Sequence, residues 1–218
     1  MSPLVVLVHG WSFDPRMWEG VVAHLPDLEC VTIDFGYFGS RPSRAGPLLQ
    51  NDRRIIAVGH SLGVLWLLTQ AEFDFQALVS INGFPRFLEA TGFTPAVRPG
   101  ALTLLHRQFL RDPLQALARF RAEAGAPPID AAPHRERLLQ GLDWLAELDG
   151  RARLAQKLER TWALAGAHDA VVPLAMSRQA FGTLPAQHFI VDERPGHVLP
   201  LTDPARCAEP VRRALQSL

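Results

Sequence analysis

The stretch AVGHSLGVLWLL, residues 57–68, decides the fold of this chain. It places Ser61 between two glycines, after the apolar run 54–59 and before an apolar stretch typical of a helix. A strand, a tight turn carrying the serine and a helix together make a nucleophile elbow, in which glycines leave room for a strained turn that exposes the hydroxyl. The alternative is a serine that merely caps the helix. The glycines on both sides favour the elbow.

Short apolar runs alternate with amphipathic stretches along the chain, which indicates strands connected by helices. The hydrophobicity of these runs is continuous and does not alternate, as expected of a parallel sheet that is covered on both faces. We therefore predict an α/β protein. The predicted strands are residues 4–8, 30–34, 54–59, 77–81, 161–166 and 188–192.

A long interval separates the fourth and fifth predicted strands. So long an insertion between consecutive strands should have a structure of its own, and we expect a helical cap over one end of the sheet. We predict that residues 85–160 form this cap and that 1–84 and 161–218 form the core. The predicted cap helices are 99–110, a segment opened by Asp112 and Pro113, the stretch from Pro133 to Leu148, and 151–159.

A serine hydroxyl is a weak nucleophile at neutral pH and needs a base and an orienting acid. In this kind of sheet the expected order along the chain is serine, acid, histidine. Asp169 lies just beyond the predicted strand 161–166, and His197 lies in a loop after the last predicted strand. The carboxyl ends of strands are where α/β sheets assemble their sites. We therefore predict a catalytic triad of Ser61, Asp169 and His197.

Acyl transfer also needs donors for a developing oxyanion, commonly backbone amides at a helix start and in an adjoining loop. The Leu62 amide follows the nucleophile, and the loop HGWSFD after the first strand supplies the Trp11 amide. We predict that these two amides form the oxyanion hole. We expect structural roles for His60 and for His9, with proton transfer by His9 as the alternative. The prediction includes no metal and no organic cofactor.

The motifs HGW, GHSLG, GAHDAVVP and PGHVLPLTDP occur in the order of the α/β-hydrolase superfamily, which the sequence resembles over nearly its whole length. Within that superfamily it is most similar to the pimeloyl-acyl-carrier-protein methyl ester carboxylesterases of biotin synthesis. Three stretches carry this resemblance: LVHGWSFDPRMW (7–18), INGFPRF (81–87) and LLQGLDWLAELDGRARLAQ (138–156). The resemblance implies a serine carboxylesterase that hydrolyses the methyl ester of a pimeloyl chain held on acyl carrier protein.

The sequence departs from the superfamily after the second predicted strand. The usual turn DxPGxGxS reads DFGYFGSRP (34–42), with Gly36 and Tyr37 in place of proline and glycine. The interval from Asp34 to Arg54 leaves little or no room for a helix. We also expect the superfamily's N-terminal hairpin to be absent. These differences predict a sheet of about six, mostly parallel strands with the 30–34 strand at one edge.

The predicted cap carries a local excess of positive charge in a chain whose formal net charge is zero. An acyl carrier protein is acidic, so an arginine-rich cap suits its docking, although a solvated face would have the same composition. We assign Arg111 and Arg119 to substrate docking, and Trp11 and Phe120 to the acyl pocket. The arginines are residues 86, 98, 107, 111, 119 and 121, against Glu89 and Asp112; the phenylalanines that line a channel or pack the cap are 87, 93, 109 and 120.

The composition excludes several classes of protein. The 22 basic and 22 acidic residues cancel, so we expect no nucleic-acid partner. No apolar run reaches the roughly 20 residues of a membrane span, and Cys30 and Cys207 predict no disulfide framework. We expect a cytoplasmic monomer whose partner is acyl carrier protein. The alternatives are a general short-chain carboxylesterase, thioesterase or lactonase of the same fold, and a ligand receptor without turnover, which the intact triad disfavours.

Overall fold

The computed structural model describes residues 3–39, 42, 53–193 and 196–218. Its centre is a six-stranded sheet in the order β2-β1-β3-β4-β5-β6, and every neighbouring pair is parallel. The predicted α/β class is confirmed, and β2 lies at an edge as expected. The strands are β1 (Leu4–Val8), β2 (Glu29–Ile33), β3 (Ile55–His60), β4 (Ala77–Ile81), β5 (Thr161–Gly166) and β6 (Phe189–Asp192).

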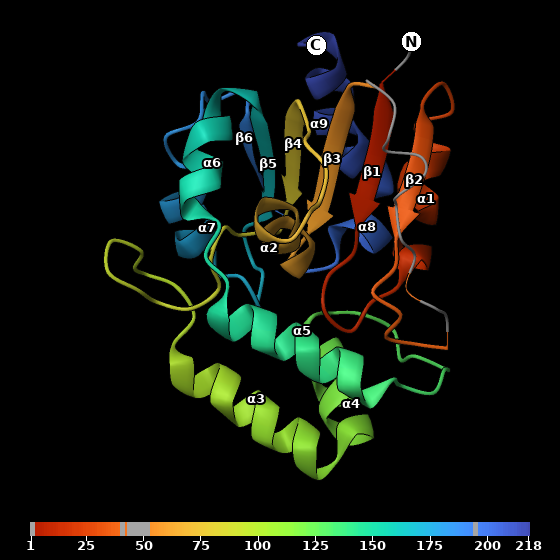
Figure 1. The fold of residues 1–218 in the computed structure, drawn as a ribbon, viewed down its shortest axis with the longest axis vertical. Coiled ribbons are helices and arrows are strands. Elements are labelled where there is room, and N and C mark those ends of the chain that lie inside the picture. Colours follow the sequence, from red (N-terminus) through yellow and green to blue (C-terminus); the bar gives the residue numbers. More distant parts are fainter. Residues whose placement is uncertain (1–2, 40–41, 43–52, 194–195) are drawn as a thin grey trace.

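Helices cover both faces of the sheet, which explains why its central strands are buried throughout (Figure 1). On β1, alternate residues face opposite layers, with Val6 in one buried cluster and Val5 in the other. One face carries α2 (Leu62–Thr69), α6 (Arg151–Lys157), η3 (Leu158–Arg160) and α7 (Leu174–Phe181); the other carries η1 (Pro15–Trp18), α1 (Glu19–Ala23), α8 (Leu199–Thr202) and α9 (Pro204–Gln216).

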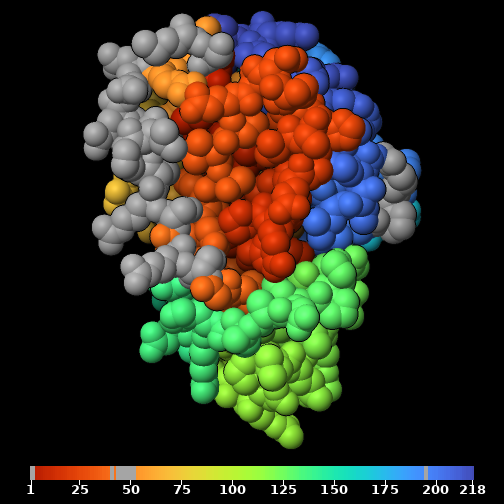
Figure 2. Space-filling model, turned by 90° about the vertical axis from the view of Figure 1, so that its right-hand side faces the viewer, coloured from red at the N-terminus to blue at the C-terminus, as the bar shows by residue number. Residues whose placement is uncertain are grey.

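The insertion between β4 and β5 is helical, as predicted. Helices α3 (Pro99–Arg111), α4 (Pro113–Glu123) and α5 (Arg135–Glu147) lie beyond the carboxyl ends of the strands (Figure 1). Figure 2 shows them as a separate green lobe, which we call the cap. Helix α6, which the predicted boundaries place with the cap, instead packs beside α2: a Cβ at Gly150 would lie 2.6 Å from Leu68 Cβ.

Local signals account for where the helices begin. The Asp112 carboxylate accepts a hydrogen bond from the Gln115 amide at 3.0 Å and Pro113 opens α4. Asp14 and Pro15 begin η1 in the same way, and the Asp14 carboxylate accepts a hydrogen bond from the Arg16 amide at 2.9 Å. An aspartate that caps the helix and a proline in its first turn are the expected start of a helix, so the predicted start at Asp112 and Pro113 is confirmed.

Two other sequence features have a structural outcome. No helix in the described ranges is long and apolar enough to cross a bilayer, and both cysteines are free thiols. The predicted lack of a helix between Asp34 and Arg54 falls mainly on residues 40–41 and 43–52, which lie outside the described residues.

Candidate active site

Ser61 lies in the turn between β3 and α2, with φ 54° and ψ −122°. This backbone conformation is strained for a residue with a side chain. The flanking glycines make it possible, because a Cβ at Gly63 would lie 2.2 Å from the Val8 carbonyl oxygen and one at Gly59 would lie 2.6 Å from the Val64 nitrogen. Only 6% of Ser61 is exposed. The turn therefore has the form of a nucleophile elbow that is largely covered.

The structure brings Asp169 and His197 together from two different loops. His197 Nδ1 donates to Asp169 Oδ2 at 2.8 Å, and both side chains are 1% exposed. The other carboxylate oxygen accepts the Val171 and Val172 amides, each at 2.8 Å. Burial raises the pKa of Asp169, but the His197 charge, its hydrogen bond and these amides together lower the pKa below its usual value. The carboxylate is therefore charged and holds the imidazole in one orientation.

The remaining ring nitrogen of His197 is free to act as a base. Nε2 is buried and has no hydrogen-bond partner within the described residues. Because Nδ1 carries the proton donated to Asp169, Nε2 of the neutral ring has a free lone pair. This is the nitrogen that a serine nucleophile would use for proton transfer.

Asn82 also belongs to this site, although no role was predicted for it from the sequence. It directly follows β4 with φ 47°. Its Nδ2 donates to Asp169 Oδ2 at 2.6 Å and to the Gly196 carbonyl at 3.0 Å, next to His197. The available signal was a polar residue directly after a buried strand, at the same sheet edge as Asp169. Asn82 thus fastens the carboxylate to the loop that carries the histidine.

The two other histidines near the elbow have structural contacts. His60 Nε2 donates to the His197 carbonyl at 2.8 Å. Burial, and after it the charge of His197, lower the pKa of His60 to about 3, so its ring is neutral at physiological pH. His9 Nδ1 donates to the Gly10 carbonyl at 2.9 Å, while its Nε2 accepts the Phe35 amide at 3.1 Å. Both rings therefore support backbone near the site.

The loop after β1 passes directly beside the serine. A Cβ at Gly10 would lie 3.0 Å from Ser61 Cβ, so only a glycine allows this approach. The next residue is Trp11, and neither its amide nor that of Leu62 donates to another residue in the described part of the chain. Two backbone donors without acceptors therefore flank the serine, which suits an anion-binding site.

The Trp11 side chain contacts all three cap helices. Its ring centroid lies 6.0 Å from that of Phe109 on α3 and 4.8 Å from that of Phe120 on α4. Its Nε1 donates to the Leu138 carbonyl on α5 at 2.8 Å. The structure thus joins Trp11 and Phe120, the two residues assigned to the acyl pocket. Trp11 and the other three phenylalanines, Phe87, Phe93 and Phe109, are buried in one apolar cluster of the cap and sheet, and Phe120 packs against it.

The unusual turn after β2 also contacts the cap. Tyr37 is fully buried, and its hydroxyl has no hydrogen-bond partner within the described residues. Burial, and then the Asp34 charge, raise the pKa of Tyr37. Gly141 on α5 makes room for this ring, because a Cβ there would lie 2.4 Å from the tyrosine oxygen. The Tyr37 carbonyl accepts the His134 amide at 2.7 Å. The substitution of tyrosine for glycine therefore contributes to cap packing.

The arginines of the predicted cap have different environments. Arg111 and Arg119 are exposed. Arg86 instead pairs with Asp149 at 3.1 Å. Arg121 is only 6% exposed and bonds to backbone carbonyls. The sequence could not show this, because its partners Ser12 and Pro127 are brought to it by the fold.

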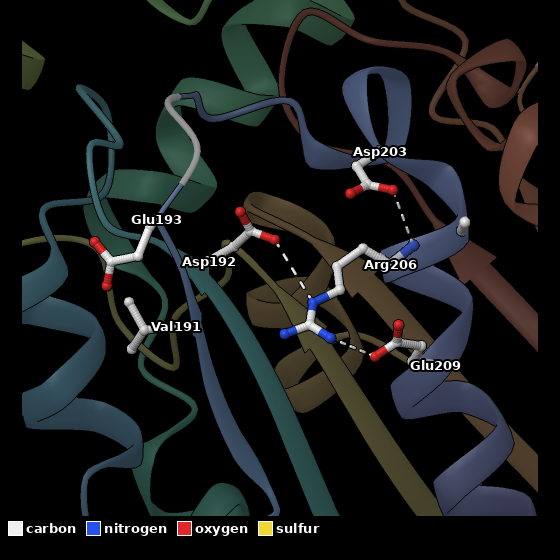
Figure 3. A pocket seen from close by; sticks show the side chains of 7 residues that line it. Val191, Asp192, Glu193, Asp203, Arg206 and Glu209 are labelled. Atoms are coloured by element: carbon white, nitrogen blue, oxygen red, sulfur yellow. Dashed lines mark hydrogen bonds and ion pairs between the residues drawn. The ribbon is translucent and has the colours of Figure 1, made fainter.

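A separate pocket of about 470 Å³ lies where β6 ends and α9 begins (Figure 3). Arg206 spans it, 2.6 Å from Glu209 and 3.6 Å from Asp192. Asp203 accepts the Arg206 amide at 3.1 Å and so caps α9. These contacts fasten the last strand to the last helix, and none of the predicted site residues lines the pocket. Across the described residues, no cluster of side chains suits a metal ion.

Residues 5–209 match the family model described as the alpha/beta hydrolase family. The pimeloyl-[acyl-carrier protein] methyl ester esterase of Methylococcus capsulatus is 30% identical, with 99% of this chain and 96% of that protein aligned. The biotin biosynthesis bifunctional protein BioHC of Cellvibrio japonicus is also 30% identical, over 86% of this chain, which spans only 42% of that protein. An esterase structure from Exiguobacterium antarcticum shares the fold, with a TM-score of 0.77 at 18% identity, covering 99% of this chain and 92% of that one. The chain belongs to the alpha/beta hydrolase family.

Proposed function

We propose that this protein is a serine carboxylesterase with Ser61 as nucleophile, His197 as base and Asp169 as orienting acid. The observation that carries the proposal is the buried 2.8 Å hydrogen bond from His197 to Asp169, which leaves His197 Nε2 unpartnered within the described residues. The strained turn at Ser61 adds the nucleophile, and the amides of Trp11 and Leu62, which donate to no described residue, add the anion site.

The reaction follows from these positions. His197 Nε2 takes the Ser61 proton as the hydroxyl oxygen attacks the ester carbonyl, and Asp169 stabilises the imidazolium that forms. The tetrahedral oxyanion accepts hydrogen bonds from the Trp11 and Leu62 amides. The C–O bond to the leaving alcohol breaks as His197 returns the proton to that oxygen. Water, deprotonated by His197, then attacks the acyl-enzyme and releases the acid and Ser61.

For the substrate, we propose the methyl ester of a pimeloyl chain on acyl carrier protein, with methanol as the leaving group. The names of the curated relatives support this choice. So does the surface of α3, where exposed Leu104, Arg107 and Arg111 follow at intervals of three and four residues and therefore share one face. A basic face with apolar side chains suits an acidic protein partner.

The first test separates a serine esterase from a ligand receptor. Ser61→Ala should lower the hydrolysis of p-nitrophenyl butyrate by on the order of 10³-fold or more, with the far-UV circular dichroism unchanged. A folded Ser61→Ala protein that keeps most of its activity would refute the mechanism.

The second test separates a carrier-bound substrate from a general ester. Arg119→Glu and Arg111→Glu should lower kcat/KM for pimeloyl methyl ester on acyl carrier protein, because both charges are exposed on the cap, while p-nitrophenyl butyrate is hydrolysed at the wild-type rate. Added salt should weaken the wild type in the same selective way. Arg213→Glu on α9, outside the cap, is the matched control. Equal rates for all variants on both substrates would favour a general carboxylesterase, thioesterase or lactonase.

A further inference from the structure

Arg121 is a buried cation that forms no ion pair among the described residues, although the Asp14 charge acts on it from farther away. It is 6% exposed, and none of the ion pairs found among the described residues involves it. Its Nη1 donates to the Ser12 carbonyl and its Nε donates to the Pro127 carbonyl at 2.8 Å. Its guanidinium also lies 4.9 Å from the centre of the Phe13 ring. Burying a charge is costly unless it is hydrogen bonded, and two of these three contacts go to one short loop, residues 11–13.

That loop has a conformation that needs support. Ser12 has φ 65°, in the left-handed region that residues with a side chain rarely adopt. Its hydroxyl is buried and has no partner within the described residues, so the serine side chain does not hold the turn. A backbone of this kind persists only where its surroundings fix it. The Arg121 hydrogen bond to the Ser12 carbonyl is the contact that the cap makes with this backbone, in addition to the contacts of the Trp11 side chain with the cap helices.

The same loop carries the groups closest to the proposed chemistry. Trp11 supplies one of the two proposed oxyanion donors. The Phe13 ring meets the edge of His60, with centroids 5.4 Å apart, and His60 in turn donates to the His197 carbonyl. A shift of residues 11–13 would therefore move an oxyanion donor and the support of the catalytic base together.

We propose that Arg121 is a positioning residue, which holds the loop 11–13 from the cap so that the Trp11 amide faces the oxyanion formed at Ser61. This proposal rests on the esterase function proposed above. It predicts that the cap sets the rate of ester cleavage even for small esters that never reach the docking arginines. Arg121 thus differs from Arg119, which is exposed on the same helix.

The test compares Arg121→Met and Arg121→Lys with a matched control. Methionine keeps the apolar stem but donates no hydrogen bond, and lysine keeps the charge but lacks the planar fork that reaches two carbonyls. Arg153 provides the control, because its guanidinium lies 5.2 Å from the Phe75 ring centre and donates to the Phe73 carbonyl, on α6 and away from the site. We expect Arg121→Met to lower kcat for p-nitrophenyl butyrate by about 10- to 100-fold, with KM within about twofold. The kcat of Arg121→Lys should lie between those of Arg121→Met and the wild type, and the kcat of Arg153→Met should equal that of the wild type.

A second readout excludes a purely structural role. An alkylboronic acid forms a tetrahedral adduct on Ser61 with an oxygen in the oxyanion hole, so its affinity should fall by about the same factor as kcat. In Arg121→Ala, millimolar methylguanidinium should restore part of kcat by refilling the guanidinium site, whereas sodium or urea should not. Urea unfolding identifies which variants are folded. If Arg121→Met does not fold, the same measurements on Arg121→Lys test the proposal.

Each outcome distinguishes the two proposals. If wild-type hydrolysis does not depend on Ser61, the proposed function fails and this inference falls with it. If hydrolysis depends on Ser61 but folded Arg121 variants keep wild-type kcat and boronic acid affinity, the esterase function stands and the positioning role is refuted. A loss of kcat without loss of boronic acid affinity would refute it as well.

Discussion

His60 offers a test of the buried support beneath the catalytic loop, through the dependence of stability on pH. Burial and the neighbouring His197 lower the pKa of His60 from 6.5 to about 3. Below pH 6.5 the unfolded chain therefore takes up a proton at this residue that the folded chain does not accept. The contribution of His60 to the free energy of unfolding is therefore fully present above pH 6.5. It is lost progressively as the pH falls toward 3.

The magnitude follows from one proton. Each pH unit within this window changes the free energy of unfolding by about 1.4 kcal/mol, so the fall from pH 6.5 to 4.5 costs about 3 kcal/mol. In His60→Gln, the amide still donates to the His197 carbonyl but does not titrate. We expect the wild type to lose about 3 kcal/mol more than His60→Gln over this range.

Urea unfolding at pH 7.5, 6.5, 5.5 and 4.5 measures this difference directly. His24→Gln, at an exposed position directly after α1, controls for the loss of one imidazole. Its pH dependence should parallel that of the wild type. If the curves for His60→Gln and the wild type are parallel too, His60 titrates in the folded protein and the argument from its burial is wrong.

Three further replacements test the site and its cover. Asp169→Asn should leave the fold intact and lower kcat by about 10⁴-fold, because an amide holds the imidazole in the wrong tautomer. A near-normal rate would mean that another carboxylate is the acid of the triad. Asn82→Ala removes the donors to Asp169 and Gly196 and should lower the free energy of unfolding by about 2 kcal/mol in urea; unchanged stability would contradict these bonds. Gly141→Ala places a Cβ 2.4 Å from the Tyr37 oxygen and should cost about 1–3 kcal/mol, seen as a lower Tm; an unchanged Tm would mean that the cap packs more loosely.

The strands and the starts of the helices could be predicted because their signals are local. An apolar run such as residues 77–81 shows in the sequence that both faces are buried, and Asp112 with Pro113 marks a helix start regardless of what the helix packs against. The positions of Ser61, Asp169 and His197 also followed from local signals, since each lies just after a predicted strand. Parallel strands then bring these loops to one edge of the sheet.

The contacts between cap and core could not be predicted in this way. The sequence shows that Arg121 is charged, but its burial depends on Ser12 and Phe13, which the fold brings to it from the far end of the chain. Tyr37 was visible as a departure from the superfamily, yet its burial depends on the missing side chain of Gly141. Asn82 is different, because a polar residue directly after β4 was a signal that could have been used.

Trp11 has a consequence for protein engineering. Because its side chain touches α3, α4 and α5, the cap is not an interchangeable module that begins at residue 85 and ends at residue 160. In a chimera that received only this insertion from a relative, the transplanted cap would pack against a Trp11 and a turn at residues 35–38 that come from a different protein. In the native chain, the Phe35 ring of this turn lies 5.4 Å from that of Trp144 in the cap. To change substrate preference by transplanting a cap, residues 11–13 and 35–38 would have to be exchanged with it.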